Sequence, residues 1–330
     1  MRRLLCVLLI VTTGLVSHLV HAKAYKGAEI YSNDSFLYGR YEIRMRVANA
    51  SGVLSTFFTY KNGSEVGNTF WEEIDIEVFG KNNATEWQSN IILGSSRPTL
   101  HTEQVHNANT SLANTYHTYV LEWTPDYVAW YLDGVEVRRI TGTSTVTSLT
   151  NPQSLRFNLW ASDSILWAGE WDDSVLPVYQ FVNYIDYKAY NTTTKTFEGG
   201  WRDDFTTLDS ARWGTANWTF EGNRVYFAPE NVVIKDGILV LALTKENATG
   251  YTGTPPADEP ANASSSAASS IAVSSSAAAS STASSIAASA AASSVATSKT
   301  SGGSGGGGGA FNLLGLIALC GLLLVRRGKK

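Results

Sequence analysis

Apolar and polar residues alternate one by one along several segments of this 330-residue chain. Residues 41–47 read Tyr-Glu-Ile-Arg-Met-Arg-Val, an alternation that places every apolar side chain of a strand on one face. A hairpin turn is predicted at Asp133-Gly134. Because no segment has a convincing amphipathic helical pattern, we expect an all-β fold of two packed antiparallel sheets. The further strands that the sequence predicts are 117–122, 127–132, 135–140, 154–160, 180–190 and 232–244.

Composition divides the chain into four parts. Residues 1–22 have Arg2-Arg3 directly after Met1, continue with an apolar run and end in Val-His-Ala, which is typical of a secretory signal peptide. The alternative, a short membrane anchor, is disfavoured because the apolar run is too short to span a bilayer. Residues 23–246 hold all 10 Trp and have the size of one β-domain. Residues 247–309 are mostly Ser, Ala, Thr and Gly and are predicted to be a disordered linker.

The fourth part, residues 310–330, is an apolar segment with a basic end, Arg-Arg-Gly-Lys-Lys. Its apolar stretch would span a bilayer only marginally. Together with the preceding glycine run, it resembles the glycine-glycine carboxy-terminal sorting signals of Gram-negative bacteria. The resemblance implies a secreted or cell-surface protein, partners in the export and C-terminal processing machinery, and contact of this segment with the membrane. A permanent single anchor is the alternative.

Charge and cysteine positions limit the partners of residues 23–246. The whole chain has 29 Asp and Glu against 25 Lys and Arg, and the central region is more acidic still because basic residues gather in both terminal segments. An acidic domain does not follow a phosphate backbone, so nucleic acid is not an expected partner. Cys6 and Cys320 both lie in the terminal segments, so the domain has neither a disulfide nor a thiolate metal site.

The most informative segment is 71–78, which reads Trp-Glu-Glu-Ile-Asp-Ile-Glu-Val. On a strand, Glu73, Asp75 and Glu77 project to one face and the apolar residues between them to the other. Three acids on one face repel one another, which favours a functional site over the alternative of a charged edge strand. Glu73 and Glu77 would have Cα atoms about 13 Å apart on a straight strand. Their side chains would have to lean inward to reach the separation of about 5 to 5.5 Å of a retaining glycosidase pair.

The motif Glu-Ile-Asp-Ile-Glu at 73–77 resembles the active-site strand of family-16 glycoside hydrolases, specifically the licheninases. Further matches lie at 57–60, 117–127 and 156–160, and the resemblance covers residues 24 to about 246. Laminarinases and the agar- or carrageenan-cleaving relatives carry one extra residue before the last Glu, which this chain lacks. The resemblance implies an antiparallel β-jelly-roll sandwich and a catalytic domain at 23–246.

One departure concerns the order of segments. Residues 203–243 resemble the segment that opens the domain in most licheninases, yet here they come last. The arrangement is similar to that of naturally circularly permuted licheninases. Such a permutation is physically mild when the termini lie close together at the surface.

The resemblance also implies roles for individual residues. Glu73 would be the nucleophile, Glu77 the general acid/base, and Asp75 a hydrogen-bond partner of the nucleophile. Ionised neighbours would raise the pKa of Glu77 and keep it protonated. A structural calcium would be bound by the side chain of Asn183 with backbone oxygens near Asp204 and Gly237. The implied sugar contacts are Phe58, Tyr60, Asn62, Glu65, Asn90, Arg156, Asn158, Trp160, Trp167 and Trp218, and the tryptophans left to the core are Trp123, Trp130 and Trp213.

The sequence therefore predicts a retaining endo-glycosidase that hydrolyses β-1,4 bonds next to 3-O-linked glucose in mixed-linkage β-1,3-1,4-glucan. No cofactor is expected for the chemistry itself. A family-16 β-1,3-glucanase or galactanase is one alternative, and the missing residue in the acidic motif argues against it. A non-catalytic, lectin-like glucan-binding domain is the other, and it would not need the three acids.

Overall fold

Strands make up most of the part of the chain that the structure, a computed structural model, describes: residues 23–95 and 97–258. The expected signal peptide, most of the expected linker and the C-terminal segment lie outside these residues. Within them, none of the helices has the length and apolar character of a membrane span.

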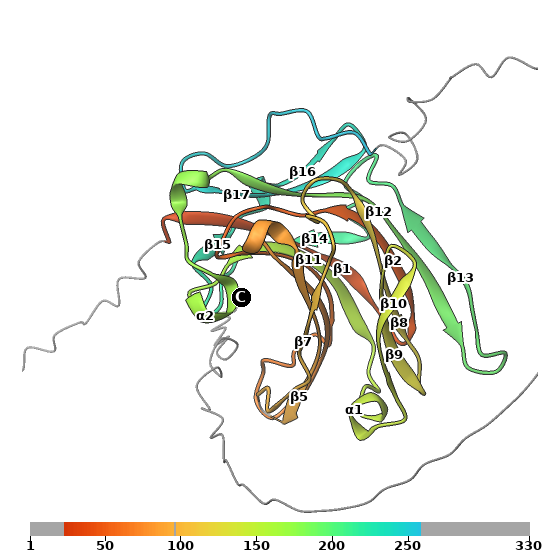
Figure 1. Cartoon of the computed structure of the whole chain (residues 1–330). Helices are drawn as coiled ribbons and strands as arrows, with labels where there is room; N and C mark the ends of the chain where they lie inside the picture. Colours follow the sequence, from red (N-terminus) through yellow and green to blue (C-terminus); the bar gives the residue numbers. More distant parts are fainter. Residues whose placement is uncertain (1–22, 96, 259–330) are drawn as a thin grey trace, which may run out of the picture. The chain divides into compact units, whose positions relative to one another are not determined.

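Two curled antiparallel sheets lie face to face (Figure 1). The first, which we call the inner sheet, contains in spatial order β14 (Trp213–Thr215), β1 (Tyr25–Phe36), β11 (Gln153–Ala161), β3 (Val53–Tyr60), β4 (Phe70–Phe79) and β5 (Glu86–Ser95), with β6 (Leu100–His101) and β7 (Gln104–Asn107) pairing with β5. The second, the outer sheet, contains β16 (Val232–Lys235), β17 (Ile238–Lys245), β12 (Val178–Asn191), β2 (Gly39–Arg46), β8 (His117–Trp123), β9 (Tyr127–Leu132) and β10 (Val135–Thr141), with β13 (Thr196–Asp203) also pairing with β12. This is the predicted jelly-roll sandwich.

The remaining elements are short. Strand β15 (Val225–Phe227) pairs in parallel with the start of β1. The helices are η1 (Asn82–Ala84), α1 (Ser144–Thr147), α2 (Ile165–Ala168), η2 (Asp173–Val175) and η3 (Pro229–Asn231).

The predicted strands are confirmed, with one correction. Residues 232–244 are not one strand but the hairpin β16–β17, because Asp236 and Gly237 form a two-residue turn. Both turn residues have positive φ angles, 53° and 73°, as the Asp-Gly pair favours. The same turn chemistry was recognised correctly at Asp133-Gly134, where φ is 49° and 80°.

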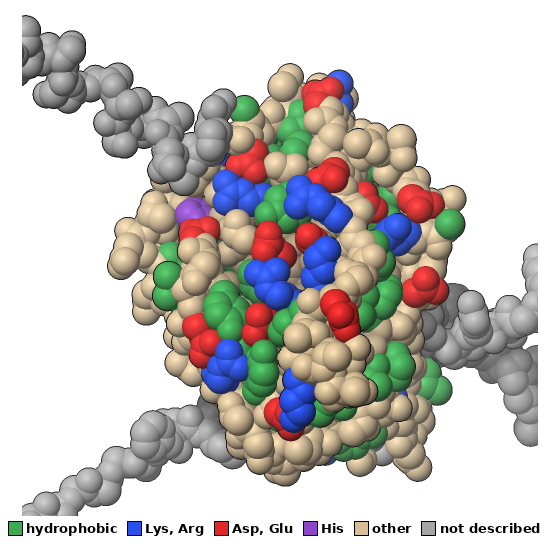
Figure 2. Space-filling model, turned by 90° about the vertical axis from the view of Figure 1, so that its right-hand side faces the viewer, with side chains coloured by type: hydrophobic (Ala, Val, Ile, Leu, Met, Phe, Trp, Pro, Cys, Tyr) green, Lys and Arg blue, Asp and Glu red, His purple; other side chains and the backbone are tan. Residues whose placement is uncertain are grey.

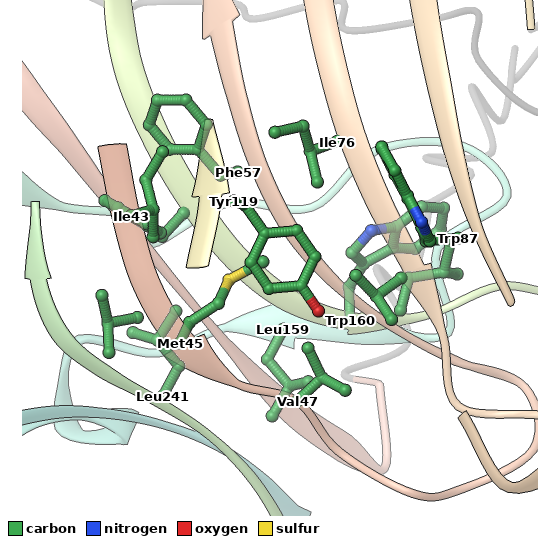
Figure 3. Close-up of a cluster of buried hydrophobic side chains, with 14 of the residues drawn as sticks. Ile43, Met45, Val47, Phe57, Ile76, Trp87, Tyr119, Leu159, Trp160 and Leu241 are labelled. Carbon is green, nitrogen blue, oxygen red and sulfur yellow. The ribbon is translucent and has the colours of Figure 1, made fainter. Parts of the chain in front are cut away.

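The hydrophobic core fills the space between the sheets. Alternate residues of each strand point into it, as period-two patterning requires. Trp123, Trp130 and Trp213 are buried there, as predicted. Figure 3 shows side chains of both sheets pointing toward one another: Ile43, Met45, Tyr119 and Leu241 from the outer sheet, and Phe57, Ile76, Trp87 and Leu159 from the inner sheet.

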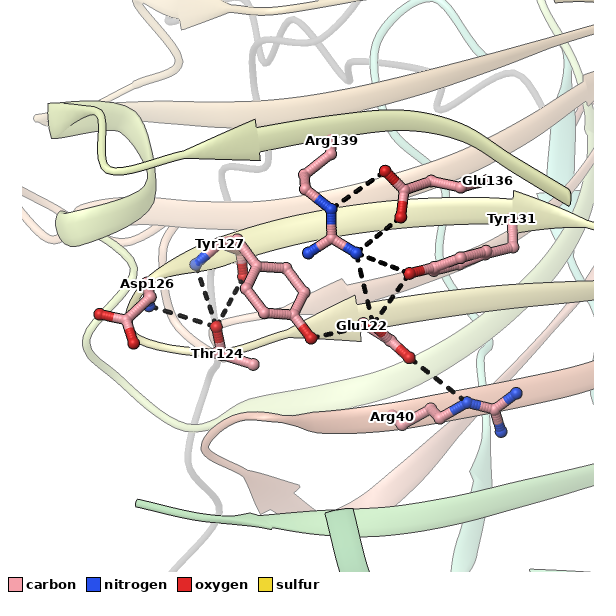
Figure 4. A network of polar contacts seen from close by, with 8 residues as sticks. All are labelled: Arg40, Glu122, Thr124, Asp126, Tyr127, Tyr131, Glu136 and Arg139. Atoms are coloured by element: carbon pink, nitrogen blue, oxygen red, sulfur yellow. Dashed lines mark hydrogen bonds and ion pairs between the residues drawn. The ribbon is translucent and has the colours of Figure 1, made fainter. Parts of the chain in front are cut away.

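The solvent face of the outer sheet carries charged side chains close to partners of opposite sign (Figure 2). Glu122 accepts hydrogen bonds from the hydroxyl groups of Tyr127 and Tyr131 at 3.0 and 3.1 Å, and its carboxylate lies 3.6 Å from Arg40 (Figure 4). The guanidinium of Arg139 lies 4.0 Å from the centre of the Tyr127 ring. The charged and hydroxyl groups of this face thus have partners in one another.

Residues 247–258 pack against the sandwich instead of starting the linker. Tyr251 makes edge-to-face contacts with Tyr179 and Phe181, at centroid distances of 4.7 and 5.8 Å. Asp258 accepts hydrogen bonds from Arg44 at 2.6 and 2.9 Å and from Asn183 at 2.7 Å. The expected boundary at Glu246 is therefore too early. The boundary predicted from composition is wrong because a few anchoring side chains are enough to hold a segment that is rich in small residues against the sandwich.

A chain ending at Glu246 should consequently be less stable than one ending at Asp258. It loses a charge-assisted pair to Arg44 and the ring that covers Tyr179, which together are worth about 2 to 3 kcal/mol. Urea denaturation of the two truncated chains measures the difference. Equal midpoints would show that residues 247–258 contribute nothing to the fold.

Candidate active site

Glu73, Asp75 and Glu77 project from one face of β4, as the alternation predicts. The residues between them, Ile74 and Ile76, are fully buried in the core. The three acids are only 7, 3 and 8 % exposed, yet all of them line a cleft with a cavity volume of about 390 Å³. Acids that are nearly buried and still border a cavity can act on a bound molecule without being surrounded by water.

Strand register assembles the cleft in rows across the inner sheet. Each row consists of directly paired residues from neighbouring strands, so their side chains lie side by side on one face. The row through Glu77 is Glu29, Asn158, Thr56, Glu77 and Gln88. The row through Asp75 is Tyr31, Arg156, Phe58, Asp75 and Asn90. The row through Glu73 is Ser154, Tyr60, Glu73 and Ile92.

Most of the predicted sugar contacts lie along this cleft. Those that line it are Phe58, Tyr60, Asn62, Glu65, Arg156, Asn158, Trp160 and Trp218. Asn90 and Trp167 are not among its lining residues, so the sugar contacts implied for these two residues stay predictions. The side-chain oxygen of Asn90 accepts a hydrogen bond from the amide of Thr102 at 2.8 Å. The indole N–H of Trp167 donates to Gln88, at 3.3 Å.

Arg156 organises the polar wall of the cleft. Its guanidinium donates to Glu29 Oε1 and to Asn62 Oδ1, both at 2.8 Å, and lies 4.8 Å from the centre of the Tyr60 ring. Asn158 donates to the other oxygen of Glu29, at 3.2 Å. Burial raises the pKa of Glu29, and these donors oppose the rise. The wall thus presents fixed donors and acceptors to a polyhydroxylated ligand.

The three acids of β4 titrate as a group. Burial raises the pKa of Glu73 to about 7, against a hydrogen bond of 2.7 Å from the Trp71 indole N–H. Burial and the charge of Glu73 raise the pKa of Glu77 to about 8. Burial and the charges of both neighbours hold the pKa of Asp75 well above its usual range.

The groups around each acid separate their roles. The Trp71 donor, a hydrogen bond with Asp75 and the nearby guanidinium of Arg156 lower the pKa of Glu73 against the effect of burial and so favour its ionised form. The negative charge of Glu73 raises the pKa of both Glu77 and Asp75 and so favours their protonated forms. A carboxylate beside a protonated carboxyl group is the pair that a retaining glycosidase needs.

Several lining residues were not predicted from the sequence. Trp71 lies two residues before Glu73, so strand alternation could have placed it on the same face. Alternation could also have placed Glu29 and Tyr31 on one face of β1, but not opposite Asn158 and Arg156. Gln88 could not have been found, because its register opposite Glu77 depends on the irregular connection 80–85. The unpredicted residues at the cleft are Glu29, Tyr31, Ser32, Asn33, Thr56, Trp71 and Phe220, with Gln88 bonded to Glu77.

The three positions implied for calcium meet at one place on the outer sheet. On β12, Val182 faces Leu239 of β17 and Ile185 faces Asp203 of β13. Asn183 therefore lies where the start of β17, next to Gly237, and the end of β13, next to Asp204, approach each other. Its amide nitrogen donates to Asp258 at 2.7 Å, so its amide oxygen is not used in that bond. Within residues 23–95 and 97–258, no group of three or more His, Cys, Asp or Glu could hold a metal ion.

Comparison with known proteins identifies the family. The family model of "Glycosyl hydrolases family 16" matches residues 10–175. A β-glucanase of Fibrobacter succinogenes is 45% identical over 250 residues, which cover 73% of this chain and 70% of that protein. The chain belongs to glycosyl hydrolase family 16. It is thus a glycoside hydrolase, and the acidic strand lies within the matched region.

Other family-16 members match a shorter part of the chain. A β-glucanase of Bacillus subtilis is 33% identical over 157 residues, covering 47% of this chain and 60% of that protein. The solved structure of the Bacillus licheniformis β-glucanase is 32% identical, covers 48% of this chain and 70% of that one, and has a TM-score of 0.42.

Proposed function

We propose that this family-16 hydrolase is a retaining endo-β-glucanase acting on mixed-linkage β-1,3-1,4-glucan, where it cleaves β-1,4 bonds next to 3-O-linked glucose. One observation carries the proposal: Glu73 and Glu77 border one cleft, where hydrogen-bond donors favour the ionised form of Glu73 and the charge of Glu73 favours the protonated form of Glu77. The 45% identity to a protein named β-glucanase supports the substrate class.

The reaction follows from the two carboxyl groups. The Glu73 carboxylate attacks the anomeric carbon while Glu77 gives its proton to the leaving oxygen, and a glycosyl-enzyme forms. Glu77, now ionised, then removes a proton from water, which releases the sugar with its original configuration. Asp75, kept protonated, adds no second negative charge beside Glu73. Carboxyl groups and water suffice, so no cofactor takes part.

The cleft lining suits a chain of glucose units. Aromatic rings cover the apolar faces of pyranose sugars, while amide, carboxylate and guanidinium groups bond their hydroxyls. The lining offers both kinds of group: the rings of Phe58, Tyr60, Trp160 and Trp218, and the polar groups of Asn62, Glu65, Arg156 and Asn158.

Substrate choice is tested by reducing-sugar release from lichenan, laminarin and agarose. We expect hydrolysis of lichenan alone. Faster release from laminarin would contradict the proposal and favour a β-1,3-glucanase, and release from agarose would favour a galactanase. Binding of lichenan without hydrolysis would favour a lectin-like domain.

We further propose that a structural calcium binds at Asn183 with the backbone oxygens near Asp204 and Gly237. The strand register that joins these positions supports the site, and oxygen ligands suit calcium. Adding calcium to the EDTA-treated protein should raise its melting temperature, and Asn183→Ala should remove the increase. A melting temperature independent of calcium in the unsubstituted protein would contradict the site.

We also propose that the protein is exported and that its tail is processed outside the cell. Support comes from the sequence of residues 1–22 and 310–330 and from the substrate, a polymer that cannot enter cells. Intact-mass analysis of the extracellular protein should find a species that lacks residues 310–330. A species that retains them would refute processing, and a purely cytoplasmic protein would refute export.

A further inference from the structure

A polar chain from α2 ends on Glu77. The indole N–H of Trp167 donates to Gln88 Oε1 at 3.3 Å, and Gln88 Nε2 donates to Glu77 Oε2 at 2.8 Å. Gln88 is 5 % exposed and pairs directly with Glu77 between β5 and β4. The chain therefore connects a loop helix with the carboxyl group that must release and regain a proton in each turnover.

The chemistry of Trp167 determines which way the Gln88 amide points. An indole N–H can only donate, so it must face the oxygen of the amide. The amide NH₂ is then directed at Glu77. Without this constraint, a glutamine beside a carboxyl group could present either its oxygen or its nitrogen, with opposite effects on the proton.

Trp167 is itself held in place. Its ring packs edge-on against Phe79, at 5.6 Å between centroids, and at a tilt of 45° against Trp160, at 5.8 Å. Its backbone oxygen accepts a hydrogen bond from the ammonium group of Lys81 at 2.7 Å. Because Phe79 and Lys81 follow Glu77 by two and four residues, the same stretch of chain carries Glu77 and holds Trp167 in place.

We propose that Gln88 is a positioning residue, which donates a hydrogen bond to Glu77 and holds its carboxyl group in place. Trp167 fixes the orientation of the Gln88 amide that makes this hydrogen bond possible. We call Trp167 and Gln88 together the relay. The inference rests on the proposed acid/base role of Glu77. It gives Trp167 a role in orienting Gln88, whereas the family resemblance implied a sugar contact.

The hydrogen bond from Gln88 and the other groups around Glu77 have opposite effects on the pKa of Glu77. A donor directed at a carboxylate stabilises its ionised form and so lowers the pKa, whereas burial and nearby negative charges raise it. Lowering it toward the working pH helps a group that serves first as acid and then as base. The charged or titratable groups on the elements around Glu77 are Glu73 and Asp75 on β4, Glu103 before β7, Glu29 on β1 and Arg156 on β11.

The test compares three variants of the full-length chain: Gln88→Leu, Trp167→Phe and, as a matched control, Trp213→Phe. Trp213 also donates its indole N–H to a side chain, Asp203 at 2.9 Å, but it lies in the core away from the cleft. Two quantities are measured for each variant: the pH dependence of kcat/KM on barley β-glucan, and the pKa of Glu77 from NMR of ¹³C-labelled glutamate.

Gln88→Leu should move the alkaline limb and the pKa of Glu77 upward by about one pH unit. Trp167→Phe should move both in the same direction by a smaller amount with KM unchanged, and Trp213→Phe should move neither. If Gln88→Leu does not fold, Trp167→Phe still decides. An unshifted pKa of Glu77 in either relay variant would overturn the proposal, as would a rise in KM alone for Trp167→Phe, which would make Trp167 a sugar platform.

The NMR titration separates this inference from the proposed function. One outcome is that the unsubstituted protein fails to hydrolyse β-glucan, while the pKa of Glu77 in the variants shifts as expected. The proposed relay would then stand and the proposed activity would be wrong. If hydrolysis is observed and no shift occurs, the relay alone is wrong.

Discussion

Replacing Glu73 with alanine is expected to lower kcat on mixed-linkage glucan by at least about 10⁴-fold, because the residue supplies the nucleophile and the neighbouring Asp75, whose pKa is held well above its usual range, does not replace it. The fold should survive, since the side chain borders the cleft and is not part of the core. Steady-state kinetics measures the loss, and circular dichroism checks the fold.

Azide provides the sharper form of this experiment. It fits the space left by the removed carboxylate, should restore turnover and should yield an α-glycosyl azide. Glu122→Ala, on the far sheet, is the matched control and should keep the wild-type kcat (Figure 4). Wild-type activity in Glu73→Ala, or a β-configured azide product, would remove Glu73 from the nucleophile role.

Replacing Glu77 with glutamine should produce the second large effect, a loss that depends on the leaving group. Substrates with poor leaving groups need the proton most and should lose about 10²- to 10⁴-fold in kcat/KM, whereas an activated aryl glycoside should lose far less. The alkaline limb of the pH profile should also vanish. In the unsubstituted enzyme this limb reflects deprotonation of Glu77, whose raised pKa of about 8 keeps the acid protonated near neutral pH.

Parallel measurements on aryl glucosides of graded leaving-group pKa test this directly. Equal losses for good and poor leaving groups would count against an acid role for Glu77. A retained alkaline limb would assign that ionisation to another group, and Asp75 would be the next one to substitute.

Strand alternation was enough to predict how β4 presents its acids, because a strand leaves no other choice of face. It did not predict the rows that meet them from other strands. Glu29 joins the site only because β1 pairs with β11 in one register, and Gln88 only because β5 pairs with β4 in another. Register depends on the geometry of connections and on packing across the sandwich, which a single sequence does not encode in a readable pattern.

Trp167 illustrates a second limit. The resemblance implied a sugar contact for Trp167, and nothing in the sequence indicated that its N–H would face Gln88. Residue type indicates what a side chain can bind, whereas its partner is decided by the short helix α2 and by Lys81. Asp258 is a second example. It lies in a segment that was predicted from its composition to be a disordered linker, yet its carboxylate is bound by Arg44.

The products of barley β-glucan test the central claim most directly, because they report the cleavage rule and the stereochemistry together. The account predicts oligosaccharides whose reducing-end glucose is 3-O-substituted, released first as the β-anomer and detected by ¹H NMR before mutarotation. Reducing ends that are 4-O-substituted, or first products of α configuration, would contradict it.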